Sequence, residues 1–274
     1  MHLLKARLKS SFFRDAYWVV GHRERLASLR QEVDFYKSVL TGFKRGDLIF
    51  DIGANEGAKT DVFIRLGARV VAIEPDDASC ANLRARFSRF RIRPLPVTVV
   101  PQAVSDRVGS EKMLNDGPGS AVNTLSPKWA ESLKKGKEAF PYEHCGLEFS
   151  QMKVVETTTI DELIRQHGVP FFVKIDVEGL ELSALRGMQR PVPYLSFEVN
   201  LPEFRDEGLE CIRVLAHLAP TGRFNYILDC IHGLTLMEWV PADEFADVLK
   251  DCGERSIEVF WKTDAKSGRR EATG

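Results

Sequence analysis

The chain has 274 residues, of which 44% are hydrophobic and 28% are charged, a composition typical of a soluble globular protein with a full core. Its formal net charge is −1 at pH 7, which gives no field to attract nucleic acid, so no nucleic-acid partner is expected. The five cysteines form no C-x-x-C pair and no zinc-like spacing with histidine, and no apolar run is long enough to cross a bilayer. We therefore predict a cytosolic protein with no transmembrane segment and no metal site.

Residues 1–45 are predicted to form an N-terminal helical arm. Its start is basic, with Lys5, Arg7 and Lys9 among the first residues. Such a segment can lie on an anionic membrane surface, and the alternative is an arm that packs on the domain and exposes its charges. From Glu32 onward, apolar residues recur at helical spacing, which predicts a helix covering the ligand-binding edge of a sheet.

The central feature of the sequence is an apolar run, Leu48–Ile52, that leads through Asp51 into the loop Gly53-Ala54-Asn55-Glu56-Gly57. Such a run is typical of a parallel strand buried on both faces, and glycine at its carboxyl end allows the backbone to approach a ligand closely. In open α/β sheets the ligand binds at that edge. The stretch therefore predicts a buried strand that opens onto a cofactor.

Two cofactor classes fit a loop of this kind. A dinucleotide requires G-x-G-x-x-G, but here the three positions hold Gly53, Asn55 and Ala58. S-adenosylmethionine carries no phosphate, and the D-x-G-x-N-x-G pattern places the Asp51 carboxylate beside its charged amino acid end. The plainer alternative is that Asp51 only caps the following helix.

A second strand, Arg69–Ile73, ends at Glu74 and Pro75. A carboxylate at that place accepts hydrogen bonds from both ribose hydroxyls in nucleotide folds, so Glu74 fits both cofactor classes and does not discriminate between them. A third strand, Val97–Val100, is followed by Gln102 and Ala103, where the adenine of a bound nucleoside would reach.

Between and after these strands lie segments with weaker patterns. A crossover helix is expected over 60–66, and Asp77 is expected to cap the next helix, whose arginines at 84, 86, 89, 91 and 93 either bind an acidic partner or form a solvated face. Residues 107–125 are rich in turn formers and predict a hairpin near the cleft mouth. Residues 126–150 have weak periodicity and are expected to form an insertion, either a lid or a plain loop.

The other informative stretch, residues 171–181, reads FFVKIDVEGLE. It predicts a buried strand that ends in Lys174, Asp176, Glu178 and Glu181, at the same edge as Asp51. Crowded carboxylates raise the pKa of at least one of them, as a general base requires. Alternatively, Glu178 or Glu181 only caps the next helix and Lys174 only neutralises its neighbours.

A fifth strand, Tyr194–Asn200, places Glu198 and Asn200 at its cleft end. A helix is expected at about 209–218 and another at 242–249. Strands at 224–228 and 257–261 are expected to form an antiparallel pair at one edge of the sheet. The predicted domain covers residues 46–262, and residues 263–274 are predicted to form a disordered tail.

These parts, in this order, resemble the FkbM family of S-adenosylmethionine-dependent methyltransferases. The resemblance rests on residues 51–57 (DIGANEG), 74–75 (EP), 103–106 (AVSD), 159–163 (TIDEL), 174–181 (KIDVEGLE) and 185–187 (LRG). It implies a class I methyltransferase fold, α/β and Rossmann-like: a seven-stranded, mostly parallel sheet with helices on both faces, six parallel strands and one antiparallel edge strand. It also implies O-methylation of a hydroxyl on a sugar, lipid or natural-product type molecule. Family loops keep a threonine after the last glycine, here Thr60, although Lys59 is a departure.

The predicted cofactor is S-adenosyl-L-methionine, and the residues predicted to bind it are Asp51, Gly53, Asn55, Gly57, Thr60, Glu74, Pro75, Gln102, Ala103 and Asp176. For catalysis, Asp176 or Glu178 is predicted to take the proton from the attacking hydroxyl, with Glu198 and Asn200 orienting the small-molecule or glycan acceptor. Two alternatives are a nicotinamide-dependent oxidoreductase and a non-catalytic module that binds S-adenosylmethionine.

Overall fold

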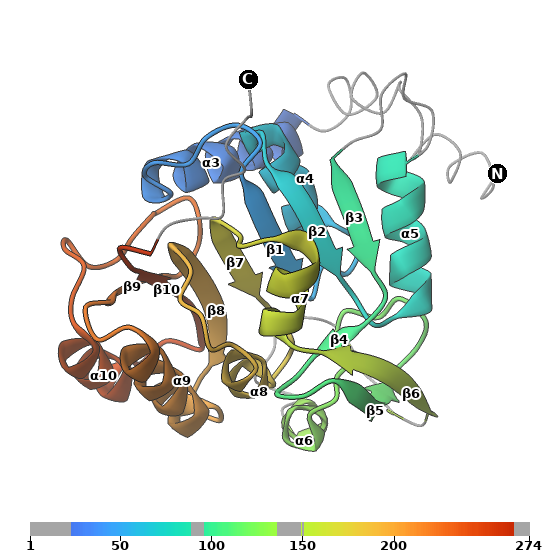
Figure 1. Ribbon diagram of the computed structural model, residues 1–274. Coiled ribbons are helices and arrows are strands. Elements are labelled where there is room, and N and C mark those ends of the chain that lie inside the picture. Colours follow the sequence, from blue (N-terminus) through green and yellow to red (C-terminus); the bar gives the residue numbers. More distant parts are fainter. Residues whose placement is uncertain (1–22, 89–95, 136–148, 150, 266–274) are drawn as a thin grey trace.

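The computed structural model describes residues 23–88, 96–135, 149 and 151–265. The first part of the predicted arm, Arg89 to Arg93 of the arginine cluster, most of 136–150 and the tail from 266 lie outside these residues. The core of the molecule is a seven-stranded sheet (Figure 1). Its strands lie in the order β3 (Val97–Val100), β2 (Arg69–Ile73), β1 (Leu48–Ile52), β7 (Phe172–Ile175), β8 (Tyr194–Asn200), β10 (Ser256–Lys262) and β9 (Arg223–Ile227).

The sheet is parallel except for β10, which pairs antiparallel with β8 and with β9. The pairing of the last two strands was predicted, but the single antiparallel edge strand implied by the family resemblance is wrong, because β10 is second from the edge. Val259, Phe260 and Trp261 are fully buried there, whereas β9 begins at the exposed Arg223. The more apolar strand therefore occupies the interior position, hydrogen-bonded on both sides.

Helices cover both faces of the sheet because side chains alternate along each strand. Ile49 of β1 packs in one cluster with helices α3 (Arg23–Val39) and α4 (Ala58–Leu66), and α5 (Asp77–Ser88) lies beside them over Ala72. The neighbours of Ile49, Leu48 and Phe50, face the opposite cluster. That cluster is covered by α7 (Ile160–His167), α8 (Glu181–Arg186), α9 (Arg205–Leu218) and α10 (Ala242–Asp251).

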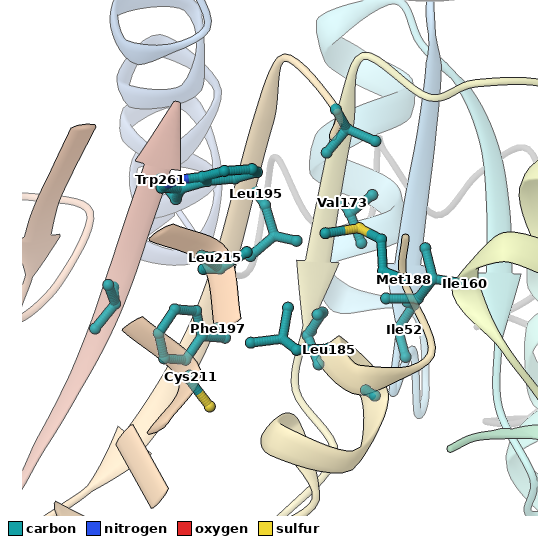
Figure 2. Packing of buried hydrophobic residues seen from close by; sticks show 14 of the residues in the cluster. Ile52, Ile160, Val173, Leu185, Met188, Leu195, Phe197, Cys211, Leu215 and Trp261 are labelled. Atoms are coloured by element: carbon teal, nitrogen blue, oxygen red, sulfur yellow. The ribbon is translucent and has the colours of Figure 1, made fainter. Parts of the chain in front are cut away.

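The larger core fills the space between the sheet and helices α7, α8 and α9 (Figure 2). Four of its side chains come from three neighbouring strands and are at most 1% exposed: Ile52, Val173, Leu195 and Phe197. They pack against Leu185, Cys211 and Leu215 of the helices, and Trp261 closes the cluster at β10. This apolar core fixes the positions of β1, β7 and β8 relative to one another. It therefore also fixes the positions of the loops at their carboxyl ends.

A second, three-stranded sheet was not predicted. It consists of β4 (Ala103–Val104), β6 (Gln151–Thr158) and β5 (Gly109–Asn115), with β6 in the centre. The predicted hairpin of 107–125 exists as a bridge between Leu114 and Thr124, but the main partner of β5 is β6. Within the expected insertion, α6 (Pro127–Lys135) is a helix that buries Trp129 and Ala130.

No helix in the part of the chain that the structure describes combines the length and the apolar character needed to cross a membrane.

Candidate active site

A cavity of about 200 Å³ lies where the carboxyl ends of β1, β2 and β7 meet. We call it the first cavity. Seven of the ten residues predicted to bind the cofactor line it: Gly53, Asn55, Glu74, Pro75, Gln102, Ala103 and Asp176. Ser120, Asn123 and Thr124 of the predicted hairpin also line it, which confirms that this segment lies at the cleft.

The glycine loop brings the ends of β1 and β7 into direct contact. Gly53 has a φ of 80°, in the left-handed region that favours glycine. A Cβ atom added to Gly53 would lie 1.7 Å from the carbonyl oxygen of Asp176. Only a residue without a side chain therefore allows the loops after β1 and β7 to form one wall of the cavity.

Glu74 ties the end of β2 to the glycine loop. Its two carboxylate oxygens accept hydrogen bonds from the backbone N–H groups of Asn55 and Asp76, each at 2.8 Å. Burial raises the pKa of Glu74 to about 7, although both hydrogen bonds act in the opposite direction. Glu74 is only 8% exposed, so it is not a solvated residue at the end of a strand. Each oxygen keeps a second lone pair, so the side chain can still accept hydrogen bonds from a ligand in the cavity.

Three residues predicted to bind the cofactor do not line the first cavity. Asp51 is 2% exposed and faces α4, where it accepts a hydrogen bond from the Thr60 hydroxyl at 2.5 Å. A Cβ atom on Gly57 would lie 2.6 Å from Phe87, so this glycine serves the packing of α4 on α5. For Asp51, Gly57 and Thr60, direct contact with a cofactor stays a prediction.

A larger hollow of about 450 Å³ lies beside the first cavity, and we call it the second cavity. Its floor is formed by β7, β8 and β10, and its wall is formed by Glu32 of α3 and Lys59 of α4, whose charged groups lie 2.7 Å apart. The helix predicted from Glu32 onward therefore does reach the ligand-binding edge. Asp176 lines both cavities, so the two adjoin at this residue.

Lys174 is a buried cation beneath Asp176. Its Nζ atom lies 2.6 Å from the Asp176 carboxylate, and its side chain is 6% exposed. In the register of the sheet, Lys174 also lies directly beside Asp51. Burial alone would lower the pKa of Lys174, but the carboxylates of Asp176, Glu258 and Asp51 raise it, so the side chain stays charged.

The predicted crowding of carboxylates is present in the structure. Oxygens of Asp176, Glu178 and Glu198 lie within 4.8 Å of one another, a spacing that could hold a metal ion. Burial, reinforced by the neighbouring carboxylates, raises the pKa of Glu178 well above its usual range and that of Glu198 to about 7. The predicted absence of a metal stays a prediction.

Glu198 is held by a pair of crossed hydrogen bonds between β8 and β10. It lies directly opposite Glu258, and the Ser256 hydroxyl donates to Glu198 at 2.6 Å, while the Ser196 hydroxyl donates to Glu258 at 2.7 Å. Like charges in this arrangement repel, and the serines offset part of that cost. Asn200, predicted to orient the acceptor, lines neither cavity.

Several neighbouring charges have structural roles. Glu181 begins α8 and accepts hydrogen bonds from the N–H groups of Val177 and Gly179, so it joins the loop after β7 to this helix. The N-cap residue of α8 is Leu180, so Glu181 does not occupy the capping position. Asp76, rather than the predicted Asp77, caps α5 by accepting from the N–H of Ser79. Arg86 binds the Glu56 carbonyl and the Asp61 carboxylate, so this member of the arginine cluster anchors the glycine loop.

A family profile described as "Methyltransferase FkbM domain" matches residues 51–255. The chain belongs to the FkbM methyltransferase family. Membership in this family confirms the predicted cofactor, S-adenosylmethionine, and the class I fold. The predicted alternative of a nicotinamide-dependent oxidoreductase loses its support.

One curated relative of this FkbM chain is the hexuronic acid methyltransferase AglP of Haloferax volcanii, 27% identical over 177 residues. The aligned region covers 64% of each of the two chains. Among solved structures, a precorrin-6y C5,15-methyltransferase from Geobacter metallireducens is 8% identical, with 86% of each chain covered and a TM-score of 0.41. The plantazolicin methyltransferase BpumL, in complex with SAH, is 9% identical, with 95% and 94% covered and a TM-score of 0.41.

Proposed function

We propose that this methyltransferase transfers a methyl group to a hydroxyl oxygen of a sugar-type or similar small molecule. The observation that carries the proposal is the junction of two cavities at Asp176. The first is formed by the loops that hold the nucleoside in such folds, and the second is lined by side chains able to accept hydrogen bonds from hydroxyl groups.

The first cavity fits the nucleoside part of the cofactor. Glu74 has free lone pairs for two ribose hydroxyls, and Gln102 and Ala103 lie where the base would extend. At about 200 Å³, this cavity is smaller than the roughly 300–1,000 Å³ usual for a ligand pocket. The charged end of the cofactor would therefore extend past Asp176 toward the second cavity.

The carboxylates around the second cavity supply the proton acceptor. Bound S-adenosylmethionine provides an electrophilic methyl group, and a hydroxyl oxygen attacks such a group more readily as it loses its proton. Glu198 lines the second cavity, and its pKa of about 7 matches a general base at neutral pH. Glu178 lines only the first cavity, and burial raises its pKa well above the usual range. We therefore assign the base role to Glu198 in preference to Asp176 and Glu178, with Asp176 positioned by Lys174.

The similarity to the Haloferax hexuronic acid methyltransferase supports a carbohydrate acceptor. The absence of nucleic acid among the partners and the cytosolic location both stay predictions from composition and cysteine pattern.

Calorimetry with S-adenosylmethionine, followed by transfer of labelled methyl groups to a panel of glycosides, tests the proposal. We expect Glu74→Ala to weaken cofactor binding by about 100-fold, because it removes a hydrogen-bonded anchor and two ligand acceptors. Glu156→Ala, which removes an exposed carboxylate on β6, is the matched control. Cofactor binding without transfer to any hydroxylated acceptor would favour the non-catalytic module. Normal binding by Glu74→Ala would refute the assignment of the first cavity.

A further inference from the structure

The second cavity combines two kinds of surface that a simple sugar would not need together. Its floor carries charged side chains from β7, β8 and β10, whereas its rim includes Leu228 and Ile231 from the loop after β9. Leu228 is 48% exposed and Ile231 is 61% exposed. Single exposed apolar residues are ordinary, but two that line the same cavity give its rim an apolar part.

The loop presents these side chains in a fixed geometry. The Asp229 carboxylate accepts hydrogen bonds from the N–H groups of Ile231 and His232, each at 2.8 Å. Further along the loop, the amide group of the buried Asn225 bonds to the backbone of Leu236 and Glu238. Ile231 is therefore held out at the rim by a hydrogen-bonded turn.

The charges on the cavity wall discriminate against an acidic ligand. Its lining includes the carboxylates of Glu32, Asp176, Glu198, Asp229 and Glu258, but only two cations, Lys59 and Lys174. Both cations are already paired, Lys59 with Glu32 at 2.7 Å and Lys174 with Asp176 at 2.6 Å. A carboxylate or phosphate on the ligand would meet carboxylates and no unpaired cation among the described residues of the lining.

Hydroxyl groups suit this wall better. Glu198 and Glu258 each accept one serine hydroxyl and keep further lone pairs that point to no other described donor. A polyhydroxylated head can donate to these oxygens, and an apolar substituent at its other end then emerges at the rim.

We propose that the second cavity binds an amphipathic acceptor, whose hydroxylated head carries no acidic group and whose apolar substituent lies along Leu228 and Ile231. The inference rests on the proposed function, because it names the substrate class of that same site. It also separates this chain from the relative named for hexuronic acid, since the head of that substrate is acidic.

The test uses the full chain saturated with S-adenosylhomocysteine and a panel of methyl and octyl glycosides of glucose, galactose, mannose and rhamnose, below their micelle concentrations. For at least one head group, we expect the octyl glycoside to bind about tenfold more tightly than the methyl glycoside, a gain that burial of roughly two methylene groups supplies. Octyl glucuronide is expected to bind more weakly than octyl glucoside.

Ile231→Asn should reduce the ratio of octyl to methyl affinity about tenfold. The control Met152→Asn, which removes an apolar side chain of similar exposure (66%) from β6, should leave that ratio unchanged. Equal binding of methyl and octyl glycosides for every head, no binding by any of them, or tighter binding of the glucuronide would overturn the inference. Cofactor binding and methyl transfer to another acceptor would survive that result, whereas a chain that binds no S-adenosylmethionine would overturn the proposed function itself.

Discussion

The two cavities differ in the kind of atoms that form their walls. The first is shaped by backbone: Gly53 lies against the Asp176 carbonyl, and Glu74 is held by two backbone N–H groups. The second is shaped by long side chains from β8, β10 and the loop after β9, with paired lysines and crossed serine–glutamate bonds. Backbone geometry tolerates almost no substitution, whereas side chains can be exchanged one at a time. We therefore expect the first cavity to tolerate fewer substitutions than the second.

Gly53→Ala should produce the largest effect of any single substitution in the site. The new Cβ would lie 1.7 Å from a carbonyl oxygen, so β1 and β7 must separate or the loop must refold. We expect a loss of stability of about 3 kcal/mol or more in urea unfolding and a complete loss of cofactor binding in calorimetry. Gly46→Ala is the matched control, because Gly46 also has a positive φ (91°) but open space around it. It should cost about 1 kcal/mol. Similar losses in the two variants would show that the close approach to Asp176 is unimportant.

Lys174→Met tests the role of the buried lysine and its carboxylate partners at the second cavity. The variant leaves the buried carboxylate of Asp51 and the half-buried carboxylate of Asp176 without their shared cation, which we expect to cost about 3 kcal/mol at pH 8. The cost should be smaller at pH 5.5, because burial raises the pKa of Asp51, which takes up a proton more readily once the cation is gone. Urea unfolding at both pH values measures it.

Lys250→Met is the control for that experiment, since Lys250 is exposed and pairs with Asp247 on the surface. Its removal should change stability by less than about 1 kcal/mol at either pH. A pH-independent loss in Lys174→Met would contradict the assignment of Lys174 as a cation shared by carboxylates.

The same contrast explains which elements could be predicted from the sequence. Central strands such as β1 and β8 are apolar runs that end at polar residues, so their bounds and their shared edge were predictable. In β6 exposed and buried residues alternate, but the apolar residues Met152 and Val154 lie on the exposed side. Apolar residues in the sequence therefore do not mark the buried side, which obscured the strand pattern.

The orientation of Asp51 was beyond sequence reasoning for a geometric reason. Strict alternation would place Asp51 and Gly53 on the same face, but the chain leaves the strand at Gly53 with a positive φ, so alternation no longer applies. Likewise, no spacing indicates that Glu198 faces Glu258, because β10 enters the sheet between β8 and β9 only in the folded topology.

Glu198→Gln tests the assignment of the general base. Because the pKa of Glu198 is about 7, the wild-type transfer rate at saturating cofactor should rise as pH increases through 7, where the carboxylate form accumulates. The variant should be at least about tenfold slower and lose this rise. Ser256→Ala, which removes the hydroxyl that donates to Glu198, should shift the rise to higher pH, since that hydrogen bond favours the ionised form. Identical pH profiles in all three proteins would indicate that another carboxylate is the general base.

Glu181→Gln should give the smallest effect of the substitutions in the site, and it should raise the stability of the protein rather than lower it. Glu181 is 7% exposed, and burial raises its pKa to about 8 from an ordinary value of 4.5. The folded state therefore keeps a proton that the unfolded chain loses, and this residue lowers the stability of the wild type progressively as pH rises from about 4.5 to about 8. Glutamine keeps an oxygen for the N–H groups of Val177 and Gly179 without a titrating proton.

The variant should accordingly match the wild type near pH 4.5 and be more stable by roughly 2 kcal/mol at pH 8.5, because the full linkage is reduced by relaxation around the charged form. Urea unfolding across this range provides the measurement, with Glu156→Gln, an exposed position, as the control. A variant less stable than the wild type at pH 8.5 would mean that Glu181 acts as an ionised acceptor for the loop after β7. The position of that loop would then depend on a buried charge rather than on a neutral hydrogen-bond acceptor.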